Sequence, residues 1–400
     1  MNYINGPINV VRMEGKINDI PKVIYLYMDY HSNIDWQLQC EELSIDVHYH
    51  ISDNIKKIKS NKTVDFFAEI QPSEINIKDT DYRGRYIDEI NRFFKKNIKI
   101  DVTKKQNKSS QKSSQNDKIR YHYIDIRDVL RNNVYYFTDK MIQISKDALY
   151  HDTLPNIKNI HIYIDKINVI LDILYKFTFE KYEYDPKKHK LENKEYNETL
   201  SLVYYYITKI LYKYNNKNIQ NDILSYLDLY IKPDFKIVFK IINEIIKLLK
   251  DMEKIDNNYR ILKSDYDEYY GTNYNYTVIT TKIREQLFYL DKLFHDLSQY
   301  IIYLYSKYVD IFFLRRFLDK NYITNVVTYT GAAHSLVYID VLAKYYDFKI
   351  THISYNALND IDTLNKEIKS TKKYNDLHKL LFPKYLTQCS NIKDFPEGFN

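Results

Sequence analysis

Residues 23–28 read Val-Ile-Tyr-Leu-Tyr-Met, and the polar stretch Asp-Tyr-His-Ser follows directly at residues 29–32. A short, nearly continuous apolar run that ends in polar residues is typical of a strand buried on both faces. Such strands belong to parallel sheets, because helices cover both faces of those sheets. The sequence therefore predicts a buried strand that ends at Asp29.

Further segments of the chain repeat this character and alternate with helical patterns. Apolar, strand-like runs occur at residues 64–70, 120–126, 325–330 and 348–355. Amphipathic helical patterns occur at residues 86–96, 332–346 and 375–381. Strands that alternate with helices predict an α/β fold, with a mainly parallel sheet flanked by helices.

Residues 128–320 show helical periodicity and little else. Within them, residues 283–318 carry apolar side chains in steps of four and three, a heptad seam that only Arg315 interrupts. The seam could pack against other helices of this chain or support self-association, and we favour the first because neighbouring helices can cover that face. The sequence thus predicts an α/β core of residues 20–127 and 321–360, interrupted by a long all-helical insertion at residues 128–320.

Residues 103–118 are rich in Lys, Ser, Gln and Asn and contain no core-forming side chain. This composition predicts a disordered surface loop. A basic arm that binds nucleic acid is the alternative. We do not favour it, because the net charge is only +6 over 400 residues and basic residues are interleaved with acidic ones.

The sequence also bears on location. Residues 1–22 contain no apolar signal segment, and four charged residues interrupt the most apolar stretch, residues 300–318. We therefore expect neither secretion nor a membrane span. The two cysteines, Cys40 and Cys389, form no disulfide framework and no CxxC motif. We expect them to be small buried side chains in a reducing, cytoplasmic compartment.

The chain contains 43 Tyr and only 6 Gly, and Ile, Asn and Lys are abundant. These residues have AT-rich codons, and the composition resembles that of proteins from large DNA viruses of protists or from AT-rich parasites. A viral protein would work in the host cytoplasm or the virion. No Gly-rich phosphate-binding motif occurs, which argues against a nucleotide fold of that kind.

Ionisable residues stand where four predicted strands end. In chain order they are Asp29, His31, Glu69, Asp125, Arg127 and His334. Ligands of parallel α/β sheets bind beyond the carboxyl ends of the strands, so we expect these side chains to gather at one edge. Gly331 lets the strand at residues 325–330 turn tightly into the helix that follows it. The positive N-terminal end of that helix favours a neutral imidazole at His334.

This set of residues suits water activation. His31 and Glu69 could share the work of a general base, with His334 as a second base or a ligand. The same three residues could hold a divalent metal with open positions. Arg127 could bind an anionic group or stabilise developing charge. Each residue also has a structural explanation when taken alone, such as a simple ion pair between Asp125 and Arg127.

These residues resemble motifs of the superfamily that includes erythromycin-esterase-like, ChaN-like and Tiki-type proteins. The matching features are Asp29 with His31 after the first strand, Glu69 after the second, and the late Gly-x-x-His element at Gly331 and His334. The family usually has Gly-Glu before the first histidine, whereas this chain has Asp-Tyr. The resemblance implies ester hydrolysis through a His-activated water, metal-dependent peptide cleavage, or haem and iron binding.

The sequence therefore predicts a hydrolase-like protein, similar to an esterase or a metalloprotease, that acts on a small molecule or peptide. The alternative is a non-catalytic viral structural or interaction protein that keeps the fold and works through its helical insertion. Side chains of His31, Glu69 and His334 that lay more than about 10 Å apart could not share one water and would exclude the enzyme.

Overall fold

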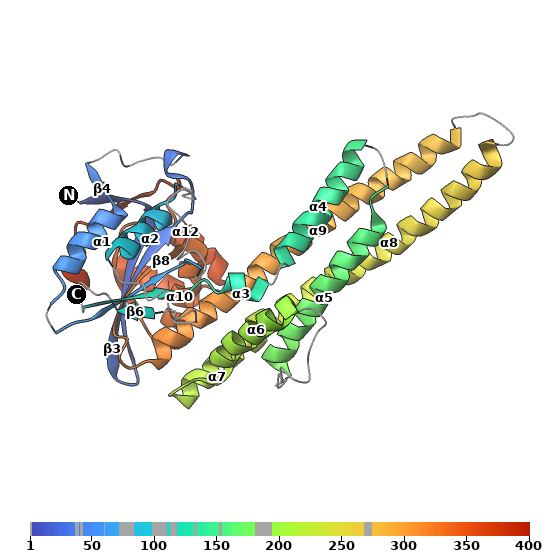
Figure 1. The fold of residues 1–400 in the computed structure, drawn as a ribbon. Coiled ribbons are helices and arrows are strands. Elements are labelled where there is room, and N and C mark those ends of the chain that lie inside the picture. The colour runs from blue at the N-terminus through green and yellow to red at the C-terminus, as the bar shows by residue number, and fades with distance from the viewer. Residues whose placement is uncertain are drawn as a thin grey trace. The chain divides into compact units, whose positions relative to one another are not determined.

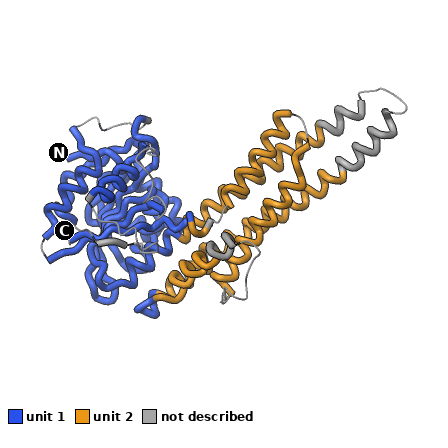
Figure 2. Tube along the Cα trace, viewed as in Figure 1, with its two compact units in different colours: residues 1–128, 214–219, 309–400 blue, residues 129–213, 220–308 orange. Residues whose placement is uncertain are grey.

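The structure is a computed structural model that describes residues 2–36, 40, 43–59, 61–71, 84–97, 110–112, 118–131, 134–151, 154–180, 194–267 and 274–400. The chain divides into two compact units (Figure 1; Figure 2). Unit 1 comprises residues 1–128, 214–219 and 309–400, and unit 2 comprises residues 129–213 and 220–308.

Unit 1 is built on a sheet with the strand order β6-β7-β5-β8-β3-β2-β9. The strands are β2 (Pro7–Ile17), β3 (Ile20–Asp29), β5 (Val64–Ala68), β6 (Ser110–Lys112), β7 (Ile119–Tyr123), β8 (Asn325–Gly331) and β9 (Lys349–Ile353). The four central strands β7, β5, β8 and β3 are parallel, whereas β2 is antiparallel to β3 and β6 to β7. The carboxyl ends of the four central strands therefore lie at one edge of the sheet.

Helices cover both faces of the sheet, which explains why its central strands are apolar. Every residue of β5 and β8 is buried. On one face Phe66 packs against Phe94 of α2 (Tyr86–Asn97), with 4.6 Å between ring centroids. On the other face Phe67 packs against Phe313 of α9 (Tyr274–Asp319) at 5.1 Å. Consecutive side chains of a strand point to opposite faces, so both helical layers contribute to the core.

The remaining elements of unit 1 lie at the ends of the chain and between strands. They include the helices α1 (Val47–Lys56), α10 (Ala332–Tyr345), α11 (Ile361–Ser370) and α12 (His378–Leu381). Short 3-10 helices cover Ile34–Trp36, Tyr374–Leu377 and Glu397–Phe399. A second sheet has the order β10-β1-β4, formed by β1 (Tyr3–Asn5), β4 (Ser44–Asp46) and β10 (Cys389–Asn391).

The predicted core of residues 20–127 and 321–360 was too small. Residues 2–19 and 361–400 also belong to unit 1, and β2 pairs with β3 along almost its whole length. The turn between these strands is formed by Asn18 and Asp19, both with positive φ. No glycine marks this hairpin, so the usual Asn-Gly or Asp-Gly signal is missing from the sequence.

Most of the predicted loop at residues 103–118 lies outside the described residues. Within it, Ser110–Lys112 form β6, which pairs with β7 at the edge of the sheet. The prediction of a structureless loop is wrong for these three residues. An edge strand can be held by backbone hydrogen bonds alone, and its polar side chains left no apolar signal.

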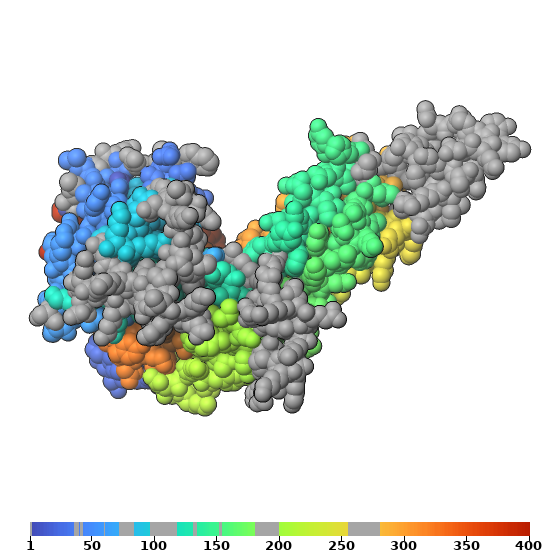
Figure 3. All heavy atoms as spheres, in the orientation of Figure 1, coloured from blue at the N-terminus to red at the C-terminus, as the bar shows by residue number. Residues whose placement is uncertain are grey.

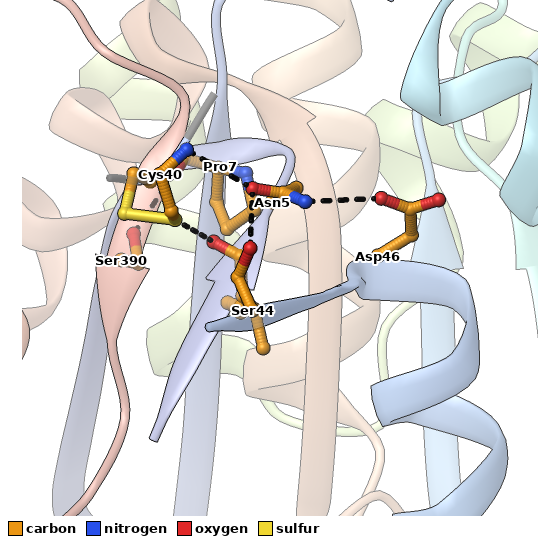
Figure 4. The surroundings of a disulfide bond; sticks show 8 residues. Asn5, Pro7, Cys40, Ser44, Asp46 and Ser390 are labelled. Atoms are coloured by element: carbon orange, nitrogen blue, oxygen red, sulfur yellow. Dashed lines mark hydrogen bonds between the residues drawn. A yellow bond between two sulfur atoms is a disulfide. The ribbon is translucent and has the colours of Figure 1, made fainter. Parts of the chain in front are cut away.

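Cys40 and Cys389 are joined by a disulfide, with 5.0 Å between their Cα atoms (Figure 4). The prediction of two separate buried thiols is wrong, and the inference of a reducing compartment loses its basis. Pairing of β1 with β10 places Cys389 opposite Asn5, whose side-chain oxygen accepts the Cys40 N–H at 3.3 Å. The 349 residues between the cysteines hide this proximity in the sequence.

Unit 2 is helical. Besides α9, its helices are α3 (Arg127–Arg131), α4 (Val134–His151), α5 (Ile157–Phe179), α6 (Lys194–Tyr212), α7 (Lys217–Tyr226), the π-helical turn Leu227–Ile231 and α8 (Lys232–Asp267). In the space-filling view, α4 and α5 form much of the visible surface of this unit (Figure 3). Among the described residues no helix is long and apolar enough to cross a membrane.

The heptad seam of α9 is buried within the single chain. Its buried members are Leu287, Leu290, Phe294, Leu297, Ile301, Leu304, Tyr308, Ile311, Arg315 and Leu318. Polar contacts accompany the packing, such as the hydrogen bond of 2.7 Å between the hydroxyls of Tyr308 and Thr178 in α5. Self-association through this seam stays a prediction. It would require α9 to separate from the helices of the same chain that now cover the seam.

Candidate active site

Glu69 lies at the centre of a polar cluster at the carboxyl edge of the sheet. It directly follows β5, and its backbone N–H donates to the carbonyl of Tyr329 in β8 at 3.1 Å. Its buried Oε1 faces Nη2 of Arg127 at 2.6 Å and Nε2 of His334 at 3.2 Å. Its Oε2 accepts the N–H of Gly331 at 2.7 Å and faces Nε2 of His31 at 3.2 Å. Both oxygens of the carboxylate are thus shared between two donors.

His31 connects Glu69 to Asp29, the last residue of β3. Its Nδ1 lies 2.7 Å from Oδ2 of Asp29, and its backbone has a φ of 58°. This left-handed conformation is uncommon for a residue with a Cβ and turns the imidazole back towards the strand end. The side chain remains 30% exposed, so His31 is the histidine of the cluster that solvent reaches most easily.

His334 lies in the first turn of α10, three residues after Gly331, and its side chain is only 8% exposed. Its Nδ1 contacts Oδ1 of Asp310 in α9 at 2.6 Å. The cluster therefore alternates carboxylates and imidazoles, in the order Asp29, His31, Glu69, His334 and Asp310. Asp310 was missing from the predicted site. The only signal for it was a charged residue inside the most apolar stretch of the chain.

Arg127 and Asp125 also belong to the cluster. Both residues follow β7, at the same edge of the sheet as Glu69. The guanidinium of Arg127 donates to both oxygens of Asp125 at 2.8 Å and reaches Glu69 through Nη2. A second residue that sequence reasoning missed is Gln388, whose Nε2 donates to Oδ1 of Asp29 at 2.6 Å. All six predicted residues are thus brought together, with Asp310 and Gln388 added to them.

The carboxylates control the charge of both imidazoles. Burial alone would lower the pKa of His31, but Glu69 and Asp29 outweigh burial and raise that pKa to about 10. Glu69 and Asp310 likewise outweigh burial and raise the pKa of His334 to about 10. The pKa of Glu69 is well below its usual value, because the two imidazolium charges outweigh the burial that would raise it.

Both imidazoles are therefore cationic at neutral pH. The expectation of a neutral His334 at the start of a helix is wrong, because two adjacent carboxylates outweigh the partial charge of the helix end. The expected general-base role of His31 and Glu69 also changes. A protonated His31 can donate a proton, whereas Glu69 already accepts four N–H groups.

The arrangement does not fit the expected divalent metal. Each ring nitrogen of His31 and His334 faces a carboxylate oxygen, and each oxygen of Glu69 is shared by two donors. A metal needs the lone pairs that these contacts occupy. Across the described residues, no group of three or more His, Cys, Asp and Glu side chains is arranged to hold a metal ion.

Comparison with known proteins identifies relatives along the whole chain. The model of a family of unknown function, DUF5847, matches residues 2–400. This chain belongs to the DUF5847 family. It is 35% identical over 421 aligned positions to Uncharacterized protein R706 of Acanthamoeba polyphaga mimivirus, covering 99% of this chain and 96% of that protein. Uncharacterized protein R161 of the same virus is 31% identical over 440 positions, covering 99% and 98%.

Membership of DUF5847 corrects the resemblance to erythromycin-esterase-like, ChaN-like and Tiki-type proteins, which is wrong. A match across residues 2–400 outweighs motifs of one to four residues at strand ends. Such motifs recur because parallel sheets favour polar residues at their carboxyl edge in unrelated families. No solved structure matches the chain. The relatives are viral proteins, which agrees with the first of the two sources that the composition suggested.

Proposed function

We propose that this protein is a hydrolase-like enzyme in which His31 transfers protons at the carboxyl edge of the sheet. The observation that carries the proposal is the position of His31, held between two carboxylates yet 30% exposed. Its left-handed backbone adds support, because such a conformation costs about 1–3 kcal/mol and tends to occur at functional sites. A purely structural position could use glycine at no such cost.

The charge of His31 favours a role as proton donor. Its contact with Asp29 is shorter than its contact with Glu69, so Nε2 is the nitrogen that can turn to a substrate. In ester hydrolysis, water adds to the acyl carbon, and Nε2 gives its proton to the leaving oxygen as the ester bond breaks. The neutral ring then takes a proton from the added water. Arg127 can stabilise the negative charge that develops on the acyl oxygen.

The substrate, architecture and location belong to the same proposal. The substrate is a small-molecule or peptide ester, because the proposed chemistry needs only an acyl carbon and a leaving oxygen. The helical unit would be an insertion into the α/β core. Of the two locations that a viral protein could occupy, the disulfide favours the virion over the host cytoplasm, because disulfides persist at virion surfaces.

The test is hydrolysis of a panel of chromogenic esters and peptide esters by the purified full chain. His31→Ala should lower the rate about 10²–10⁴-fold, the usual contribution of a positioned acid or base. His31→Asn serves as a second variant, because asparagine tolerates the left-handed backbone. His295→Ala is the matched control, since that imidazole lies in unit 2 beside a single carboxylate, Asp291.

The dependence of the hydrolysis rate on pH distinguishes a proton donor from a general base at His31. A rate that depends on protonated His31 should fall as the pH rises through about 10. A general base would give a rate that rises with pH instead. Unchanged rates in both His31 variants would exclude the proposal, and so would a wild-type protein that hydrolyses nothing in the panel. The second result would support the non-catalytic alternative.

A further inference from the structure

The orientation of His31 depends on Asp29, and Asp29 has a second partner. Its two buried carboxylate oxygens contact different groups: Oδ2 faces Nδ1 of His31 at 2.7 Å, and Oδ1 accepts Nε2 of Gln388 at 2.6 Å. A carboxylate can rotate broadly about its bond to Cβ, so one contact alone leaves its plane free. The amide of Gln388 fixes that plane and thereby the direction in which Asp29 meets the imidazole.

Gln388 is itself held on both sides by Gly6. Its Nε2 donates to the carbonyl of Gly6 at 2.5 Å, and its backbone carbonyl accepts the N–H of Gly6 at 3.0 Å. Gly6 has a φ of 129°, and a Cβ at this position would lie 2.8 Å from Cγ1 of Val47. A side chain at position 6 would therefore require Val47 to shift and a strained backbone. Gln388 is therefore a buried amide whose Nε2 bonds to both Gly6 and Asp29, whereas its Oε1 has no partner among the described residues.

The residue that follows Gln388 is Cys389, which the disulfide links to Cys40 (Figure 4). Strand β10 pairs with β1 over only three residue pairs, and Oγ of Ser390 adds one hydrogen bond to the carbonyl of Pro7 at 2.9 Å. The disulfide adds a covalent link to these hydrogen bonds, directly beside Gln388. The disulfide and the imidazole are thus connected through Cys389, Gln388 and Asp29.

We propose that Gln388 is a positioning residue for His31 and that the Cys40–Cys389 disulfide keeps it in place, so that reduction loosens the site. A dithiol supplies two electrons and two protons, the S–S bond breaks, two thiols form, and the dithiol becomes a cyclic disulfide. Gln388 can then leave Asp29, and the carboxylate loses the amide that holds Oδ1. The catalytic meaning of this switch rests on the proposed function, but the switch itself does not.

The test reads His31 directly by NMR titration of the labelled full chain, with the resonance assigned through His31→Ala. Charged groups that face this imidazole are Asp29 and Glu69. The oxidised wild type should titrate near pH 10. Gln388→Ala, and the wild type treated with dithiothreitol, should each bind the His31 proton at least about tenfold more weakly, which is one pKa unit.

Two variants serve as controls. Cys40→Ser should reproduce the effect of reduction without dithiothreitol and should not respond to it. Gln143→Ala removes an exposed glutamine in unit 2 that donates to Asp147, and His31 in this variant should titrate as in the wild type. Coincident His31 titrations in the oxidised wild type, the reduced wild type and Gln388→Ala would overturn the proposal. A shift on reduction without one in Gln388→Ala would also overturn it. Neither result depends on whether the protein hydrolyses esters.

Discussion

The two ends of β5 carry clusters of the same residue types, but the pKa values of their histidines are shifted in opposite directions. At the carboxyl end, Glu69 lies between His31 and His334, each of which also contacts an aspartate. At the other end, Asp65 contacts Nε2 of His122 at 2.6 Å and the guanidinium of Arg120. Burial lowers the pKa of His122 to about 4, despite its bond to Asp65, whereas the pKa of each other imidazole is about 10.

The number of carboxylates around an imidazole decides this difference. His122 has one carboxylate, the cations Arg120 and Arg316 lie nearby, and its side chain is 1% exposed. Its Nδ1 has no hydrogen-bond partner among the described residues, as suits a neutral ring whose other nitrogen donates. A histidine between two carboxylates is cationic instead. Residue types alone therefore do not separate a structural cluster from a site that can exchange protons.

The largest expected effect tests the structural role of the Asp65 cluster. Asp65→Ala should lower the free energy of unfolding by about 3–5 kcal/mol, because it leaves the buried imidazole of His122 without its acceptor and removes the carboxylate that pairs with Arg120. Urea denaturation measures this loss. Asp53→Ala removes an exposed partner of Lys56 and should change stability by less than about 0.5 kcal/mol. Equal effects of the two substitutions on the free energy of unfolding would show that the Asp65 cluster does not stabilise the fold.

The next effect separates the clusters by pH. The pKa of His31 is raised on folding, so its stabilisation is complete below about pH 6.5 and is lost as the pH rises through about 10. The pKa of His122 is lowered on folding, so its stabilisation is present above about pH 6.5 and is lost as the pH falls through about 4. Each imidazole should change the free energy of unfolding by at most about 1.4 kcal/mol per pH unit within its window.

Unfolding free energies measured from pH 4 to pH 10.5 test these opposite slopes. His31→Asn should flatten the alkaline side of the curve and leave the acid side unchanged. His122→Gln should do the reverse. A shared slope change in both variants would mean that the two imidazoles have the same charge in the folded protein.

The smallest effect tests the close approach of the backbone at the carboxyl end. A Cβ at Gly331 would lie 3.0 Å from Nε2 of His31 and 3.2 Å from Oε2 of Glu69. Gly331→Ala should therefore push the imidazole aside and lower stability by about 1 kcal/mol, since the ring can move. Thermal unfolding measures the loss, and the His31 titration should shift with it. A variant with wild-type stability and an unchanged His31 titration would show that the cluster has room for the added methyl group.

Much of the fold and most of the candidate site could be predicted from the sequence. Strands β3, β5 and β8 are contiguous apolar runs, and parallel strands bring their polar ends to one edge, so Glu69 and Arg127 could be assigned together. Asp310 and Gln388 could not be assigned, because one lies in a helix and the other in the C-terminal region. Only packing brings these two to the strand ends. Strand β2 was missed because the turn that joins it to β3 carries no glycine signal.

The sequence by itself determined the central strands β3, β5, β7 and β8 and the main helices, because the period of apolar residues is local and fixes which faces are buried. It also predicted that His31, Glu69 and His334 lie at one edge, and the structure supplies their contacts. Only the tertiary structure decided that Cys40 meets Cys389, that α9 buries its seam, and that His31 is charged while His122 is neutral. Those outcomes depend on distances between groups far apart in the chain, over which Coulomb and hydrogen-bond energies change within a few ångströms.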